Sequence, residues 1–431
     1  MAVLVRVPVA KLFIDTGPLR RSRAFRRLWT GYVFRQLGAE LTATAVIYQT
    51  YVITHSNLDV GLVSLAQLGP AFCVPIVSGA ITDAVDRRKV LVVTAVMIGG
   101  TTAGLAINAA SSHPALWPVY LCAAVIQGLN SVDSPARAAV IPQIVDRDSL
   151  VAANALAQLL WQLSSMVGPG IAGVLIAGTH GDISLVYWID VGSTVMALQA
   201  VIRLPAMRPS EGGRRFSLSS IAEGFRFLSG KQVIQGCLWA DWLATVLGEP
   251  VSLFPYMALV RFHGGPQAFG LLTAAPAIGA ALGSLLSGWA TRVRRPGRAV
   301  LYALLAWGAA IVAFGVSPWL WLGVVTVALA GWADAVSVLF RTTIMQLEVP
   351  DRLRGRLFSI QAAVVVSGPR LGNVEGGFVA AASSAPLAIV VGGIGCLVAA
   401  AGLNWRMPGL ARYELDTPGE LESAQPGTAT S

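Results

Sequence analysis

The chain has 431 residues, of which 55% are hydrophobic and only 12% are charged, and its formal net charge is +9. Its mean hydropathy is +0.66. Soluble domains normally carry about 25% charged residues, so this composition excludes an ordinary soluble protein and indicates a chain embedded in a membrane.

Twelve apolar segments follow one another along the chain. Each is long enough to cross the hydrocarbon core of a bilayer, which takes about 20 residues as a helix. The predicted spans are 28–53, 58–82, 90–110, 115–136, 150–178, 183–203, 233–260, 268–291, 299–317, 319–340, 357–382 and 386–405. The sequence therefore predicts an all-α membrane protein with twelve transmembrane helices.

Positive charges fall in alternate gaps between these spans. With the N-terminus placed inside, 28 of the 31 Lys and Arg residues lie in inward segments, one (Arg261) lies in an outward loop, and two (Arg35 and Arg370) lie within spans. This bias predicts a multi-pass protein of the inner (plasma) membrane with both termini cytoplasmic. The basic residues are scattered over seven loops, so we expect lipid headgroups as their partners and no nucleic acid.

The longest inward gap divides the spans into two sets of six. The predicted organisation is a basic N-terminal segment (1–27), a six-helix bundle (28–203), a linker (204–232), a second six-helix bundle (233–406) and a disordered tail (407–431). Within the linker, residues 217–228 are predicted to form a short helix on the membrane surface.

The two sets of spans repeat each other in sequence. In the first half, the Gly168-Pro169 pair is preceded by Arg137, Pro142-Gln143 and Asp146-Arg147. In the second half, the Gly368-Pro369 pair is preceded by Arg341, Gln346 and Pro350-Asp351-Arg352. With an even number of spans in each copy, this is a parallel repeat about an axis along the membrane normal. Such repeats typically enclose a site near the middle of the membrane.

The short loop after the second span carries a recognisable motif. Its sequence, GAITDAVDRRK (79–89), resembles the loop signature of the major facilitator superfamily, although Ala84 stands where an Arg is common and Asp86 where a Gly is common. Segments similar to the drug and siderophore exporters of the enterobactin-exporter type are FRRLWTGYVFRQLG (25–38), DRRKVL (86–91), DSPARAAVIPQIV (133–145) and RLRGRLFSI (352–360). The resemblance covers essentially the whole chain. It implies two six-helix bundles, alternating access and a monomer.

The same resemblance implies a gate at the inner end of the bundles. Asp83 is expected to cap the inner end of the eleventh span, and Arg87 or Arg88 to pair with Asp133 at the end of the fourth. The alternative is that these basic residues only set the topology.

The fifth span contains Gly168, Pro169 and Gly173, which resemble a signature of antiporters in this superfamily. Small residues permit close helix approach and proline bends a helix. The match favours export over import, and the alternative is ordinary small-residue packing.

Charges inside the spans are the sharpest pointer to a site, because each costs about 2.5–3.5 kcal/mol at a helix centre on insertion scales. Buried carboxyl groups tend to have a raised pKa and can exchange protons near neutral pH. By family resemblance, spans 1, 4, 7 and 10 line the cavity. The resulting candidates for proton coupling or substrate binding are Glu40, Glu249 and Asp334, with Arg35 as a charge partner. The alternative is structural ion pairs, such as Arg35 with Glu40 or Arg370 with Glu375.

The sequence favours a secondary active exporter that exchanges protons for an amphipathic small molecule. Two alternatives stay open: an importer or uniporter of a small polar solute, and a transporter-like sensor or scaffold. The four histidines all lie in outward loops without ligand spacing, so no metal site is expected, and neither a cofactor nor an enzymatic activity is predicted.

Overall fold

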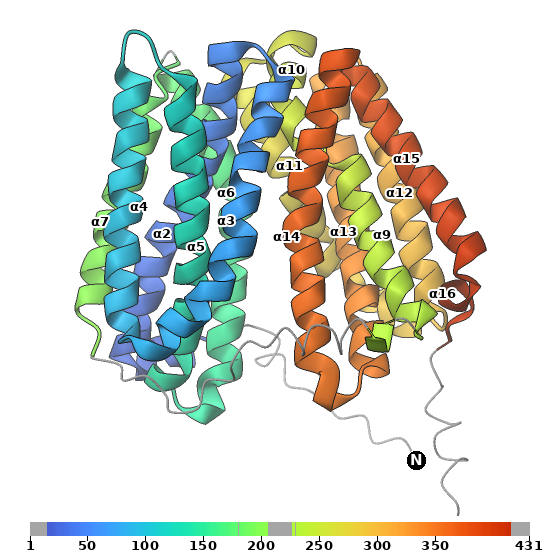
Figure 1. Ribbon diagram of the computed structural model, residues 1–431, viewed down its shortest axis with the longest axis horizontal. Helices are drawn as coiled ribbons and strands as arrows, with labels where there is room; N and C mark the ends of the chain where they lie inside the picture. The colour runs from blue at the N-terminus through green and yellow to red at the C-terminus, as the bar shows by residue number, and fades with distance from the viewer. Residues whose placement is uncertain (1–14, 180, 206–225, 229, 415–431) are drawn as a thin grey trace, which may run out of the picture. The chain divides into compact units, whose positions relative to one another are not determined.

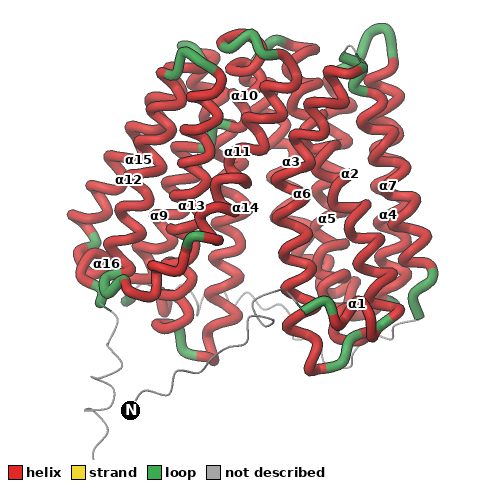
Figure 2. The backbone as a smooth tube through the Cα atoms, turned by 180° about the vertical axis from the view of Figure 1, so that it is seen from behind, coloured by secondary structure: helices red, strands yellow, loops and turns green. Residues whose placement is uncertain are grey.

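The computed structural model describes residues 15–179, 181–205, 226–228 and 230–414, with the backbone alone at 76–84, 291, 351–352, 354–356 and 358–359. Every regular element in these ranges is a helix (Figure 2). Most of the short linker helix predicted at 217–228 lies outside the described residues.

Twelve long helical segments follow one another among the described residues, in register with the twelve predicted spans. They are α2 (Arg23–Thr54), α3 (Asn57–Ala84), α4 (Arg87–Ala110), α5 (Leu116–Ile144), α6 (Leu150–Gly178), α7 (Ser184–Ile202), the segment that begins with α9 (Gln232–Gly248), α11 (Gly265–Leu285), α12 (Pro296–Val316), α13 (Leu320–Glu348), α14 (Asp351–Ala382) and α15 (Ala385–Arg406). In the part of the chain that is described, nine segments are long and apolar enough to cross a membrane. The other three, α2, α5 and α14, carry more polar and charged side chains.

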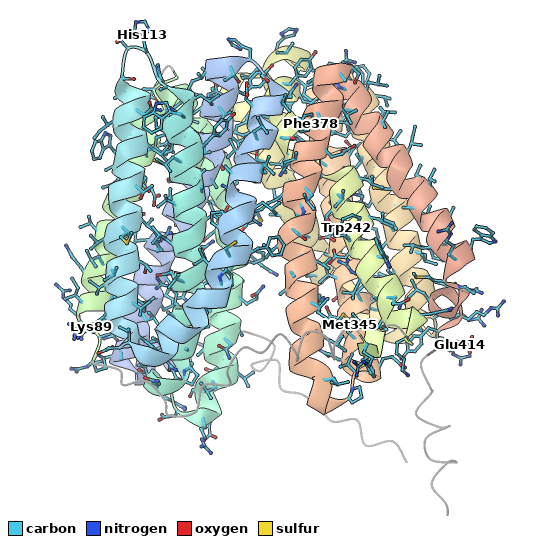
Figure 3. The ribbon with its side chains drawn as sticks, in the orientation of Figure 1. Lys89, His113, Trp242, Met345, Phe378 and Glu414 are labelled. Atoms are coloured by element: carbon cyan, nitrogen blue, oxygen red, sulfur yellow. The ribbon has the colours of Figure 1, made fainter. Side chains whose placement is uncertain are left out.

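The chain forms two compact units (Figure 1). Unit 1 comprises 1–216 and 263–274, and so contains α1 (Gly17–Arg21), α2 to α7 and the first turns of α11. Unit 2 comprises 217–262 and 275–431, and contains α9, the rest of α11 and all later helices. In unit 1, α2 packs against α6 and α7, and α4 packs against α5 and α7. Lys89 and His113 mark the opposite ends of α4 (Figure 3).

Two helix starts in unit 1 carry capping side chains. The Ser22 hydroxyl accepts a hydrogen bond from the Phe25 amide at 3.1 Å, and the Asp86 carboxylate accepts one from the Arg88 amide at 2.9 Å. Such caps satisfy backbone N–H groups that have no partner within the helix. Asp86, which departs from the superfamily pattern, therefore has a local role at the start of α4.

The seventh segment is a broken helix. Its first part, α9, ends at Gly248, and Glu249 has extended backbone angles. Pro250 explains the break, because proline lacks an N–H and disfavours helical geometry in the residue before it. The chain continues through η3 (Val251–Leu253), α10 (Phe254–Tyr256) and the π-helical η4 (Met257–Arg261). The predicted continuous span 233–260 is thus interrupted, with Glu249 at the interruption.

Helices α5 and α13 extend well beyond the predicted ends of their apolar segments. The predicted spans ended at 136 and 340, whereas α5 runs to Ile144 and α13 to Glu348. Arg137 and Arg341, assigned above to inward loops, are therefore helical and buried, at 8% and 4% exposure. The prediction that Arg35 and Arg370 are the only arginines within membrane helices is wrong.

Ordered structure also continues past the predicted start of the tail at Met407. Residues Pro408–Arg412 form α16, whose Leu410 is fully buried and packs against Gly236 and Gly297 in unit 2. Residues 415–431 lie outside the described part of the chain.

Candidate functional site

Unit 1 contains a cavity of about 750 Å³ between α2, α5 and α6. Cavities of this size hold drug-sized ligands. Residues of α2 line it at helical spacing, so one face of this helix forms a wall. The polar and aromatic lining residues are Trp29, Tyr32, Arg35, Gln36, Glu40, Asn130, Asp133, Ser134, Arg137, Asn154, Gln158 and Trp161.

Arg35 lies in this wall and is 5% exposed. Its Nη2 donates to the Asn130 side-chain oxygen at 2.7 Å. Its Nε and Nη1 atoms are buried and have no acceptor among the described residues. Arg35 is thus a buried cation with hydrogen-bonding capacity to spare at a ligand-sized cavity.

Asp133 and Arg137 form an ion pair one helical turn apart on α5. Arg137 donates to Asp133 Oδ2 through Nη2 at 2.9 Å and through Nε at 3.2 Å, and Thr94 donates to Oδ1 at 2.9 Å. The Arg137 guanidinium also lies 5.3 Å from the ring centre of Tyr32 on α2. This pair joins α2, α4 and α5 at one wall of the cavity.

In this structure Asp133 is paired with Arg137, so its pairing with Arg87 or Arg88 is not formed here and stays a prediction for the closed gate. Arg87 donates instead to the Ala139 carbonyl at 2.9 Å. The sequence placed Arg137 in a loop and so hid a partner only four residues away. The side chain of Asp83 lies outside the described residues, so its gate role stays a prediction.

Glu40 lies on the same face of α2 but is held differently. Its Oε1 accepts hydrogen bonds from Ser165 at 2.9 Å and Gln36 at 3.1 Å. It forms no ion pair with Arg35, although both residues are fully described. The structural alternative of an Arg35–Glu40 pair is therefore wrong.

The Gly-Pro motif of α6 packs directly against this carboxylate. A Cβ atom added at Gly168 would lie 2.5 Å from Glu40 Cβ, so only glycine permits the contact. A Cβ at Gly173 would lie 2.6 Å from the Pro266 carbonyl oxygen, at the start of α11 within unit 1. Pro169 lies inside α6 between these two close approaches.

Unit 2 contains a smaller cavity of about 220 Å³. It lies between the break after α9 and helices α11, α12 and α13, and its lining includes Glu249, Trp307 and Asp334. Glu249 has no hydrogen-bond donor or ion-pair partner among the described residues, and the buried Trp307 Nε1 has no acceptor there. The predicted candidates Glu249 and Asp334 thus share one cavity, while Glu40 and Arg35 share another.

A charge network leads away from the smaller cavity. Arg341 Nη2 lies 3.6 Å from Asp334 Oδ1, and Arg341 Nη1 lies 2.5 Å from Asp241 Oδ1. Asp241 and Arg341 are buried, whereas the Asp334 side chain is 43% exposed. The sequence missed Arg341, although its match to Arg137 in the internal repeat could have identified it.

The remaining charged residues of the spans lie elsewhere. Asp190 on α7 is 1% exposed and accepts a hydrogen bond from Thr42 on α2 at 2.6 Å, which ties these two helices together. Arg370 donates to the Val366 carbonyl at 2.7 Å. Among the described residues, no three His, Cys, Asp or Glu side chains come together as metal ligands would.

Each unit therefore combines a cavity with charged groups in the middle of membrane-spanning helices. The unit 1 cavity can hold an organic molecule against aromatic, amide and guanidinium groups. The unit 2 cavity places an unpaired carboxyl group at a helix break, the kind of position at which membrane transporters bind ions.

The sequence matches the family described as transmembrane secretion effector over residues 15–423. It is 30% identical to the enterobactin exporter of Citrobacter koseri over 94% of this chain and 97% of the relative, and 31% identical to that of Shigella boydii over 89% and 92%. A solved bacterial homolog of the human lysosomal transporter Spinster superposes with a TM-score of 0.72 at 14% identity, covering 94% of this chain and 100% of the other.

Proposed function

Since the chain belongs to the transmembrane secretion effector family of the major facilitator superfamily, and so is a multi-pass membrane transporter, we propose that it exports a siderophore-like small molecule in exchange for protons. The relatives named as enterobactin exporters support the direction and the substrate class. The unit 1 cavity, which has the volume and the mixed lining for such a molecule, supports a substrate site there.

The position of Glu249 is the observation that supports proton exchange. It faces the unit 2 cavity at a helix break and has no cationic or hydrogen-bonding partner among the described residues. A carboxyl group without a compensating charge in a medium of low polarity readily takes up a proton. Glu40 already accepts two hydrogen bonds, so we assign the exchanged proton to Glu249, with Asp334 as the second acid of the same cavity.

The charge bias of the sequence supports a cytoplasmic location for both termini and residence in the inner membrane. Protons would then enter as the substrate leaves. The loop residues Asp83, Arg87 and Arg88 remain candidates for an inner gate.

Everted membrane vesicles test the exchange, with labelled enterobactin as the probe and an imposed pH gradient, acidic inside. We expect uptake by the wild type to rise severalfold with the gradient. Uptake by Glu249→Gln is expected to ignore the gradient, because the amide cannot carry a proton. Glu40→Gln is the matched control and is expected to keep the gradient dependence.

Proton exchange is rejected if wild-type uptake is the same with and without the gradient. If only Glu40→Gln loses the dependence, the proton belongs to unit 1.

The amide side chains of Gln36, Asn130 and Gln158 at the unit 1 cavity favour a second candidate, a carrier of small polar solutes. That alternative gains if a nucleoside is carried while enterobactin is not.

A further inference from the structure

Arg35 differs from the buried arginines Arg137 and Arg341 in having no carboxylate bonded to it. Arg137 is bonded to Asp133, and Arg341 to Asp241 and Asp334. Arg35 has one acceptor, the neutral side chain of Asn130, and its Nε and Nη1 have none among the described residues. A guanidinium carries five N–H groups, so most of its donor capacity is unused.

Unit 2 has an acid, Asp241, near the position in the internal repeat that Arg35 occupies in unit 1. Asp241 follows Arg35 by 206 residues, close to the 204 residues that separate Arg341 from Arg137. In unit 2, the acid on the first long helix neutralises the arginine of α13. In unit 1, the first long helix carries the cation Arg35 in this region, and Arg137 is neutralised by its own helix neighbour Asp133. Arg35 therefore keeps buried N–H groups that have no acceptor in the described part of the chain, although the acids Asp133 and Glu40 line the same cavity.

A buried guanidinium whose N–H groups lack acceptors is unfavourable unless a ligand supplies them. Planar N–H pairs match the two oxygens of a carboxylate. Arg35 lies on a 750 Å³ cavity whose wall also offers Tyr32 and Trp161 to an apolar body.

From this geometry we infer that the unit 1 cavity binds an organic anion, whose acidic oxygen group is held by Arg35 and whose apolar body lies along the aromatic wall. The inference rests on the proposed function in treating this cavity as the substrate site, and it adds the charge of the substrate.

Three probes with one ring system and different charges test this inference: 2-naphthoate, 2-naphthamide and 2-naphthylmethylammonium. Binding to the full-length protein in nanodiscs is measured by equilibrium dialysis at pH 7. We expect the wild type to bind the carboxylate most tightly and the ammonium least. Arg35→Gln is expected to weaken naphthoate binding about tenfold or more, because bonds to a charged group are lost, with little change for naphthamide.

Two further variants guard against trivial outcomes. Asn130→Asp places a carboxylate beside Nη2 of Arg35 and should remove the preference for the anion with the arginine still present; it is decisive if Arg35→Gln does not fold. Arg261→Gln removes one exposed positive charge that is not part of the cavity lining, and it should leave all three affinities unchanged.

The inference is overturned if the wild type binds naphthoate no more tightly than naphthamide, which includes binding neither. It is also overturned if Arg35→Gln binds naphthoate as tightly as the wild type does. If Arg35→Gln does not fold, the same result for Asn130→Asp overturns it. Neither result depends on the pH-gradient experiment, so failure of anion binding and failure of proton exchange are distinguishable.

Discussion

At the scale of single residues, the acids in and near the two cavities differ in whether an arginine is bonded to them. Asp241 is locked to Arg341 at 2.5 Å, and Asp133 to Arg137 at 2.9 Å. Glu249 has no such partner among the described residues. A buried carboxylate bonded to arginine is a structural element, because removing either partner leaves an isolated charge. An unpaired one can change its protonation state without breaking the fold.

This contrast predicts opposite effects on stability for two acid-to-amide changes. Asp241→Asn should lower the free energy of unfolding by about 3 kcal/mol, the lower end for breaking a buried pair, because Asp334 still faces Arg341. Glu249→Gln should leave it unchanged or slightly higher. Thermal unfolding of the purified protein in detergent measures both. Equal losses in the two variants would contradict the assignment of Asp241 as structural.

At the scale of elements, the close contact of α6 with α2 links the Gly-Pro motif to a charged site. Gly168 lies against Glu40, and in unit 2 a Cβ at Gly372 on α14 would lie 2.9 Å from Glu249 Cβ. In each unit, a glycine of the helix that carries the Gly-Pro motif thus lies near a glutamate of the first long helix, although the repeat counterpart of Gly168 itself, Gly368, lies against Thr245. Movement of α6 against α2 would therefore shift the Glu40 side chain, and movement of α14 against α9 would shift that of Glu249.

The Gly168 contact can be tested with two alanines on one helix. Gly168→Ala should cost about 1–3 kcal/mol and reduce transport, because its methyl group would overlap Glu40. Gly170→Ala, which has nothing within 4 Å of the new Cβ, should be neutral or slightly stabilising. Vesicle uptake and thermal unfolding report both effects. Similar behaviour of the two variants would show that the contact is unimportant.

Most helices could be predicted from the sequence because hydropathy reports the bilayer directly. The ends of α5 and α13 could not, because an apolar segment stops at the first charge while the helix continues through it. Arg341 is stabilised in its helix by Asp241, 100 residues away, and no local pattern reveals such a partner. The candidates Arg35, Glu40, Glu249 and Asp334 were found, whereas their division between two cavities required the fold.

At the scale of the whole molecule, the two units share a repeat but differ in charge. The larger cavity, in unit 1, carries Arg35, and the smaller one, in unit 2, carries Glu249 and Asp334. Substrate and proton therefore have separate sites in our proposal. Exchange between separate sites needs a conformational change that both can bias, as alternating access supplies.

Anion export in exchange for a proton makes the whole cycle sensitive to membrane voltage. One anion leaving and one proton entering together move two charges, each worth about 2.3 kcal/mol per 100 mV. With no pH gradient, a potassium diffusion potential, positive inside everted vesicles, should drive accumulation of labelled enterobactin. Uptake that ignores this potential would show that the exchanged charges cancel.

If Arg35 selects anions, it also determines how strongly the membrane potential drives export, and so in which media the transporter can work. An exchanger of one proton for a neutral molecule moves one net charge across the membrane per cycle, while an exchanger of one proton for an anion moves two. The membrane potential therefore drives the second exchange twice as strongly. At 100 mV the second case corresponds to a concentration ratio of about a thousandfold or more across the membrane. A cell in an alkaline medium, whose pH gradient has vanished, could therefore still expel an acidic product on its voltage alone.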